Sequence, residues 1–182
     1  MVTVTTLPRG RAFTRDDLRA MPDDGNRYEL LDGILVVTPS PALRHQGMVG
    51  ELYMLLRAAC PPSHRVVLAP FDVALGERTV LQPDLVVAAR SAFTDQQLPQ
   101  APELAVEVLS PSTRLYDRHL KKARLEAAGC AHYWVVDPDG PSITAWALSD
   151  AAYVEVAHAT GSQTFRIDVP VAITVRPVDL LD

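Results

Sequence analysis

The chain has 182 residues, of which 48% are hydrophobic, and this predicts one globular domain spanning residues 1–182 with a sizeable core. Its net charge of −5 argues against a dedicated duplex-DNA binder, whose affinity comes mostly from phosphate contacts, but allows a nuclease whose acids bind metal. No apolar run is long enough for a membrane span and no secretory signal is present, so we expect a cytoplasmic protein. In that compartment Cys60 and Cys130 should be reduced thiols.

The N-terminal third of the chain predicts an arm, a short helix and a hairpin. Residues 1–13 form the arm, and Thr14 is placed to cap a helix with Asp17 three residues later. Asp32-Gly33 lies between two β-rich runs and is a strong hairpin signal. Glu29 falls in the first of these strands.

A helix is predicted from Ser40, which can cap it, to about Ala59, where Pro61 and Pro62 follow. The 3.6-residue period places one stripe of this helix against the core, formed by Val49, Leu52, Leu56 and Ala59. His45 lies on the same stripe. A titratable group that points inward at the start of a core helix needs a partner.

The rest of the chain predicts strands and one more long helix. The helix runs from about Arg114 to Ala128, with Gly129 as its C-terminal cap. The predicted strands are 65–75, 79–88, 103–109, 132–137, 143–148, 153–156 and 164–167, the last ones forming a C-terminal meander. This order indicates a mixed α/β (α+β) domain with one central mixed sheet flanked by helices.

Two acids stand in apolar, β-branched runs, Asp84 in 81–89 and Glu107 in 104–109. A carboxylate in such a run needs a partner, because an isolated buried charge is costly. If the two strands are neighbours, the acids can converge, and hard oxygen ligands suit Mg²⁺ or Mn²⁺. The alternative for either acid is a structural role, ending a strand or capping a backbone group.

Lys121 strengthens the metal-site interpretation. It shares the apolar stripe of its helix with Leu125 and Ala128, although an exposed ion pair with Asp117 is the simpler alternative. An inward lysine near metal-bound carboxylates can orient a water or neutralise phosphate charge. The surrounding segment, 114–124, holds five basic residues and one acid, and is either a solvated helix face or a phosphate-attracting surface.

Several other classes of site lack support. None of the five histidines has a second His or Cys at zinc-ligand spacing, and His45 alone could be a satisfied core residue. The chain has no glycine-rich dinucleotide motif, no Walker-type loop and no Gly-x-Ser-x-Gly elbow.

With these residues assembled, the chain resembles the Uma-type restriction endonuclease family of the PD-(D/E)xK nuclease superfamily, from about Thr14 to Leu148. The matching landmarks are Tyr28-Glu-Leu-Leu-Asp-Gly, Pro39-Ser-Pro with Arg44-His-Gln, Pro83-Asp-Leu-Val-Val, Glu107-Val-Leu-Ser-Pro-Ser-Thr and Gly129-Cys-Ala-His-Tyr-Trp-Val-Val-Asp-Pro. Each is weak alone, and their combination in this order is specific.

The resemblance implies a restriction-endonuclease-like core and Mg²⁺-dependent cleavage of nucleic acid, with DNA as the expected substrate. Asp84 and Glu107 would match the metal-binding acids, Glu29 and His45 would line the same site, and His45 would be a third metal ligand. The superfamily's usual lysine position is Leu109 here, and Lys121 on the following helix would take its role. The superfamily's habits also favour a homodimer.

Two other functions stay open at this stage. One is a catalytically inactive nuclease-fold module that binds nucleic acid or protein, which the negative charge favours. The other is a metal-dependent hydrolase of small phosphate esters.

Overall fold

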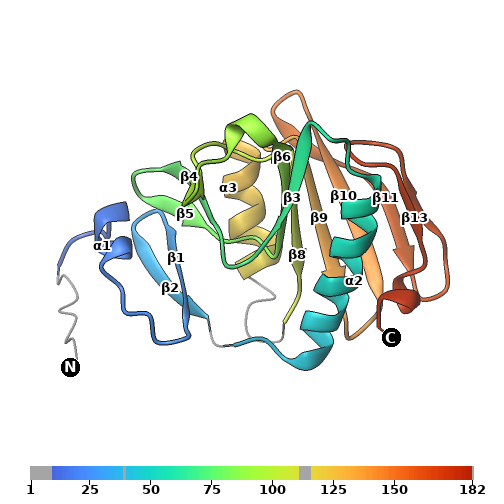
Figure 1. The fold of residues 1–182 in the computed structure, drawn as a ribbon, viewed down its shortest axis with the longest axis horizontal. Coiled ribbons are helices and arrows are strands. Elements are labelled where there is room, and N and C mark those ends of the chain that lie inside the picture. Colours follow the sequence, from blue (N-terminus) through green and yellow to red (C-terminus); the bar gives the residue numbers. More distant parts are fainter. Residues whose placement is uncertain (1–9, 39, 111–115, 182) are drawn as a thin grey trace.

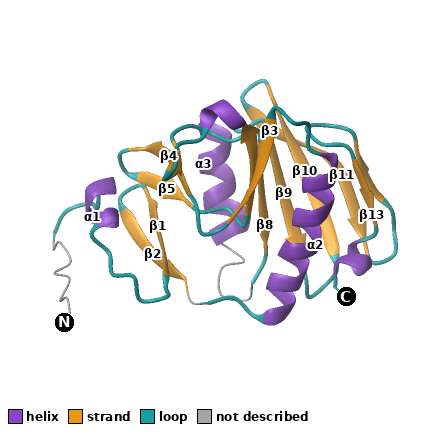
Figure 2. Ribbon diagram, in the orientation of Figure 1, coloured by secondary structure: helices purple, strands orange, loops and turns teal. Residues whose placement is uncertain are grey.

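The computed structural model describes residues 10–38, 40–110 and 116–181. Its strands are β1 (Arg27–Leu31), β2 (Ile34–Thr38), β3 (His64–Leu68), β4 (Asp72–Gly76), β5 (Thr79–Leu81), β6 (Leu85–Ala89), β7 (Gln97–Leu98), β8 (Leu104–Val108), β9 (His132–Asp137), β10 (Ser142–Ser149), β11 (Ala152–Thr160), β12 (Phe165–Ile167) and β13 (Ile173–Val175). Its α-helices are α1 (Arg15–Arg19), α2 (Leu43–Ala59) and α3 (Lys122–Ala127). Figure 2 shows how few helices accompany the many strands.

The strands form two larger sheets that lie side by side (Figure 1). One has five strands in the order β2-β1-β5-β4-β7, and the other has six in the order β11-β10-β9-β8-β6-β3. Each contains one parallel pair, β4 with β7 and β8 with β9, while the remaining neighbours are antiparallel. The predicted mixed α/β class is therefore confirmed. Two strands of the predicted C-terminal meander, 143–148 and 153–156, pair as β10 and β11, but 164–167 does not join them, because β12 pairs with β13 in a separate two-stranded sheet.

The N-terminal elements form as the local sequence predicts. Thr14 and Asp17 make a reciprocal capping box, with the Thr14 N–H 2.8 Å from an Asp17 carboxylate oxygen. The β1–β2 turn is made by Asp32 and Gly33, with φ of 52° and 82°, the left-handed conformations that a two-residue hairpin requires. A Cβ on Gly33 would lie only 2.6 Å from Ala12 Cβ, so the turn packs closely on the preceding chain.

Helix α2 carries the predicted inward stripe but begins later than predicted. Its N-cap is Ala42, with no side-chain hydrogen bond, so the predicted cap at Ser40 is wrong. Its buried residues are His45, Met48, Val49, Leu52 and Leu56, whereas Ala59, which was predicted to face the core, is exposed.

The prediction of single strands over 65–75 and 79–88 is wrong, because each run is two strands in different sheets. The first divides into β3 and β4 and the second into β5 and β6. Pro70 and Pro83 lie at the two breaks and have no N–H to donate to a strand ladder, so neither run continues in one sheet. The expected single central sheet is consequently two sheets, and the chain crosses from one to the other within each of these two runs.

The second predicted helix consists of a π-helical turn, Tyr116–Lys121, followed by α3, and Gly129 with φ of 81° follows its end as predicted. The predicted helix start, including Arg114, lies outside the described residues. Four short elements were not predicted: β7, β13 and the 3₁₀-helices Arg90–Ala92 and Pro177–Leu180.

The six-stranded sheet is covered on both faces. Met48, Leu52 and Leu56 of α2 pack on one face, against residues such as Val106 and Trp134. Leu125 of α3 packs on the other face, in a cluster that also contains Leu31, Leu81, Ala105 and Tyr133. Because Leu31 and Leu81 belong to β1 and β5, this cluster joins α3 and both sheets.

No helix in the described ranges combines the length and apolarity needed to cross a bilayer. Cys60 and Cys130 are both free thiols, as expected, the first half-buried and the second buried.

Candidate functional site

The predicted acids meet where the chain crosses from one sheet to the other. Residues 82–84 connect β5 to β6, and Asp84 immediately precedes β6. The antiparallel register pairs Leu85 with Val106 and Val86 with Ala105, and its continuation sets Asp84 beside Glu107. The predicted convergence of the two acids is therefore confirmed, with Asp84 at the entry to its strand rather than in the middle of it.

Three donors hold the Asp84 carboxylate. Arg27 Nη1 donates to Oδ1 at 2.9 Å, while Oδ2 accepts from the Val108 backbone N–H at 2.8 Å and lies 3.2 Å from His45 Nε2. Burial alone would raise the pKa of Asp84, but the hydrogen bond from His45 and the positive charges of Arg27, His45 and Lys121 outweigh it and lower the pKa to about 2. Asp84 is thus ionised at neutral pH.

Lys121 is fully buried between two other carboxylates. Its Nζ lies 2.9 Å from Glu29 Oε1 and 3.1 Å from Glu107 Oε1. Glu29 Oε1 also accepts the Gln82 backbone N–H at 2.6 Å. The inward orientation predicted for Lys121 is correct, and the lysine joins β1 of one sheet to β8 of the other.

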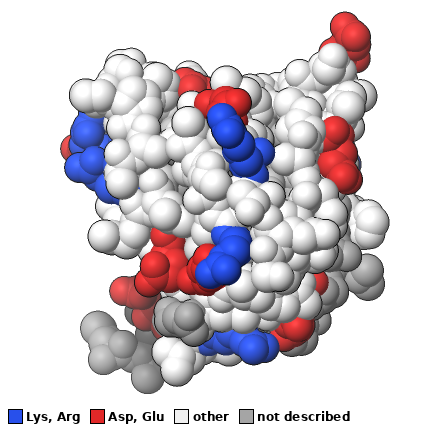
Figure 3. Space-filling view, turned by 90° about the vertical axis from the view of Figure 1, so that its right-hand side faces the viewer, with Lys and Arg blue, Asp and Glu red and all other residues white. Residues whose placement is uncertain are grey.

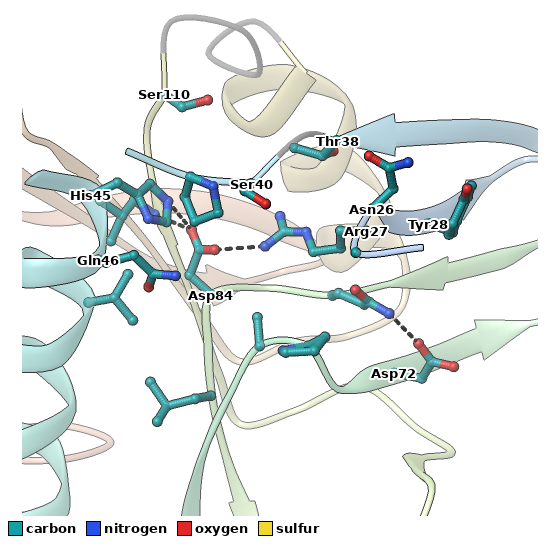
Figure 4. Close-up of a pocket in the computed structure, with 18 of the residues that line it drawn as sticks. Asn26, Arg27, Tyr28, Thr38, Ser40, His45, Gln46, Asp72, Asp84 and Ser110 are labelled. Atoms are coloured by element: carbon teal, nitrogen blue, oxygen red, sulfur yellow. Dashed lines mark hydrogen bonds and ion pairs between the residues drawn. The ribbon is translucent and has the colours of Figure 1, made fainter. Parts of the chain in front are cut away.

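A pocket of about 810 Å³ opens in front of these groups. Arg27, His45 and Asp84 line it, and Figure 4 shows the Asp84 carboxylate between the other two side chains. Glu29, Glu107 and Lys121 do not line it and have no exposed surface. The five predicted site residues are therefore brought together in two tiers, with Asp84 and His45 at the pocket and the other three behind it.

Sequence reasoning missed Arg27, the cation at the boundary between these tiers. Its Nη1 contacts Asp84, and its Nη2 lies 3.7 Å from Glu29 Oε2. Burial would lower the pKa of Arg27. The negative charges of Glu29, Asp84 and Glu107 outweigh this effect and raise the pKa above its ordinary value. The sequence did contain a signal for Arg27. Side chains alternate between the two faces of a strand, so Arg27 and Glu29, two positions apart, lie on the same face.

Gln82 was also missed, and no local pattern marks it. Its backbone N–H holds Glu29, and its side-chain amide donates to Asp72 Oδ1 at 2.8 Å on the pocket wall (Figure 4). Gln82 lies in the segment 82–84 that connects β5 of one sheet to β6 of the other. Its contact with Glu29 therefore depends on this crossing between the sheets, which no local pattern predicts.

The basic segment 114–124 does not form the free cationic surface considered above, as far as its side chains are described. Lys122 Nζ lies 3.8 Å from the centre of the Trp146 ring. The Arg124 guanidinium forms an ion pair with Asp32. Arg114 and the side chain of Arg118 lie outside the described part.

The visible face of the molecule in Figure 3 likewise has no broad basic patch among its described residues, since its blue side chains are scattered and lie beside red ones. Attraction of phosphate at this face would therefore be weak.

The donor set suits a hard divalent cation. Three carboxylates, those of Glu29, Asp84 and Glu107, lie within electrostatic reach of Arg27. Glu29 Oε2 is buried and accepts no hydrogen bond within the described ranges. Among the described residues, no group of three His, Cys, Asp or Glu side chains surrounds a single metal position. Mg²⁺, however, commonly takes only one or two carboxylates and completes its coordination with waters and phosphates.

His45 was predicted as a third metal ligand. Its Nε2 is directed at Asp84 Oδ2, which makes it a partner of an acid ligand in this arrangement. Its Nδ1 is buried with no hydrogen-bond partner in the described residues.

The fold is that of a nuclease-like protein. The chain superposes with a TM-score of 0.75 on a structure entitled "Crystal structure of a putative nuclease belonging to DUF820 from Anabaena variabilis ATCC 29413", covering 93% of this chain and 97% of the other at 18% sequence identity. A family model described as "Uma2: Putative restriction endonuclease" matches residues 15–176. The chain belongs to this family, as the resemblance in its sequence predicted. Comparison with curated proteins gave no significant match.

Proposed function

We propose that this protein is a Mg²⁺- or Mn²⁺-dependent endonuclease that hydrolyses phosphodiester bonds in nucleic acid, with DNA as the expected substrate. The observation that carries this proposal is that Asp84 lines a pocket of about 810 Å³ and lies beside Glu107, which is buried behind the pocket with Lys121 Nζ 3.1 Å away. Family membership supports the same class of reaction.

Asp84 and Glu107 would hold the divalent cation, with His45 supporting it through Asp84. When bound, such a cation polarises the scissile phosphate and lowers the pKa of a water. The ionised state of Asp84 at neutral pH suits it as a ligand, since its pKa of about 2 keeps a negative charge at the pocket.

The protein's own residues would set the geometry. Lys121 contacts Glu29 and Glu107 and does not reach the pocket, so we assign it a positioning role. The Val108 N–H and His45 hold one oxygen of Asp84 in place. A rigid carboxylate pair loses little freedom when a cation binds.

The test is a cleavage assay with supercoiled plasmid, single-stranded DNA and RNA, with and without Mg²⁺ or Mn²⁺. Asp84→Asn and Glu107→Gln should each lower metal-dependent cleavage by more than the roughly 10- to 100-fold that the loss of an outer-shell partner of a metal ligand costs. Small phosphate esters, run alongside, test the remaining hydrolase class.

Glu103→Gln is the matched control for Glu107→Gln. Glu103 lies just before the same strand, is half exposed, and contacts His64 at 2.9 Å rather than the site. It should keep wild-type cleavage. Retained cleavage in a folded, carefully purified Glu107→Gln sample would contradict the assignment.

A second candidate function has its own support in the ion pairs. Each oxygen of Asp84 already has a donor and Lys121 contacts both buried glutamates, which is also the arrangement of an inactive nuclease-fold module that binds nucleic acid or protein. Calorimetric titration with Mn²⁺ separates the two, because an inactive module should bind no metal at low-millimolar concentration. The expected homodimer is tested by sedimentation velocity.

A further inference from the structure

Arg27 holds Asp84 less firmly than a fully paired arginine would. One hydrogen bond joins Nη1 to Oδ1 at 2.9 Å, the Nη2 contact to Glu29 is 3.7 Å, and Nε is buried with no hydrogen-bond partner among the described residues. By contrast, Arg11 makes two hydrogen bonds of 2.7 Å to Asp17 in the fork geometry that suits a carboxylate. The Arg27 guanidinium is therefore under-satisfied where it stands.

Arg27 is also far more accessible than Lys121, the other permanent cation described at the site. It lines the pocket with about 20% of its side chain exposed, whereas Lys121 has no exposed surface. A divalent cation that enters through the pocket would reach Asp84 first, because Asp84 lines the pocket. Its Oδ1 already accepts the hydrogen bond from Arg27, so the cation would compete with Arg27 for this oxygen.

Arg27 keeps a use for its charge once a cation displaces it from Asp84. It lines the pocket in which a substrate phosphate would lie, and its guanidinium is well suited to phosphate oxygens.

We propose that Arg27 is a resident counter-cation of Asp84, which competes with the divalent cation and then binds the substrate phosphate. This inference rests on the proposed function. It assigns Arg27 a substrate-binding role and predicts that the protein itself limits its metal affinity.

The test compares Arg27→Met with wild type in Mn²⁺ titration calorimetry without nucleic acid. Removing a charge-assisted hydrogen bond from Asp84 should tighten Mn²⁺ binding by about tenfold or more. Arg44→Met is the matched control, because Arg44 precedes His45, is mostly exposed and lies 3.9 Å from Asp139. Its loss should leave Mn²⁺ affinity nearly unchanged.

A second measurement tests the phosphate role. In saturating Ca²⁺, fluorescence anisotropy with a short labelled oligonucleotide should show about tenfold weaker binding by Arg27→Met, since one charged phosphate contact is lost. If Arg27→Met folds poorly, Arg27→Gln keeps a donor for Asp84 without the charge. The increase in Tm produced by Mn²⁺ then reports affinity even in a less stable variant.

The outcomes are distinct. Tighter Mn²⁺ binding with weaker oligonucleotide binding supports the proposal. Unchanged or weaker Mn²⁺ binding by Arg27→Met, beside a wild type that binds Mn²⁺, overturns it and leaves the nuclease proposal intact. If neither protein binds Mn²⁺, the proposed function fails as well. Tighter Mn²⁺ binding with unchanged oligonucleotide binding removes the phosphate role.

Discussion

Replacing Lys121 by Met should destabilise the fold strongly, because this lysine is the cation between two buried glutamates. Its Nζ lies 2.9 Å from Glu29 and 3.1 Å from Glu107, and all three side chains are buried. Methionine fills a similar volume, so the change removes the charge with little effect on packing.

The expected loss is about 3–5 kcal/mol of unfolding free energy, the range measured when one partner of a buried ion pair is removed. For a chain of this size it corresponds to a fall in Tm of roughly 6–20 °C. Adding Glu107→Gln to Lys121→Met removes one of the two carboxylate charges and should recover part of the loss, because the two sites are coupled.

Urea denaturation followed by circular dichroism measures both effects. Lys122→Met is the matched control, since Lys122 stacks on Trp146 and its loss should cost no more than about 1 kcal/mol. A Lys121→Met protein within about 1 kcal/mol of wild type would refute the view that this lysine balances buried charge.

Three further predictions follow from individual residues. The pKa of Asp84 is lowered to about 2 in the folded protein, so its ionised form contributes about 2 kcal/mol to the free energy of unfolding. This contribution is complete above pH 4 and is lost as the pH falls from 4 to 2. Asp84→Asn should therefore flatten the dependence of stability on pH in that window. Gly33→Ala should cost about 1–3 kcal/mol in urea denaturation, because φ is 82° and the new Cβ would lie 2.6 Å from Ala12 Cβ. Burial raises the pKa of Cys130 to about 11, so in the folded protein a thiol reagent such as DTNB should modify Cys60 well before Cys130.

Each of these has a result that would contradict it. Asp84→Asn with the wild-type slope between pH 4 and 2 would show that this carboxylate does not drive the acid dependence. Gly47→Ala, in open space on an exposed turn of α2, is the control for Gly33→Ala and should stabilise the protein by about 0.5–1 kcal/mol. Equal reaction rates for Cys60 and Cys130 would place both thiols in similar surroundings.

Much of the local structure could be predicted because the responsible interactions are short in sequence. The Thr14–Asp17 capping box and the Asp32-Gly33 turn involve residues a few positions apart, and both formed as predicted. The inward stripe of α2 and the inward direction of Lys121 follow from the helical period alone. The convergence of the acids needed one assumption, that their strands are neighbours.

The crossings between sheets could not be predicted from periodicity. Alternating or apolar runs report how buried a segment is: 79–88 is buried along most of its length, whereas most of 65–75 is half-buried or exposed. Such runs carry no information on which sheet each half of the segment joins. Pro70 and Pro83 were the only local signs that each run would divide.

The sequence by itself determined the longer helices, the hairpin, the family and the group of acids and lysine that the site contains. Only the tertiary structure decided that Arg27 faces Asp84, that Gln82 holds Glu29, and that just Asp84 and His45 of the predicted residues reach the pocket. The physical reason is that a buried charge must be balanced by whatever cation the packing of two separate sheets brings near, and that choice depends on contacts between segments more than 50 positions apart, such as Arg27 and Asp84.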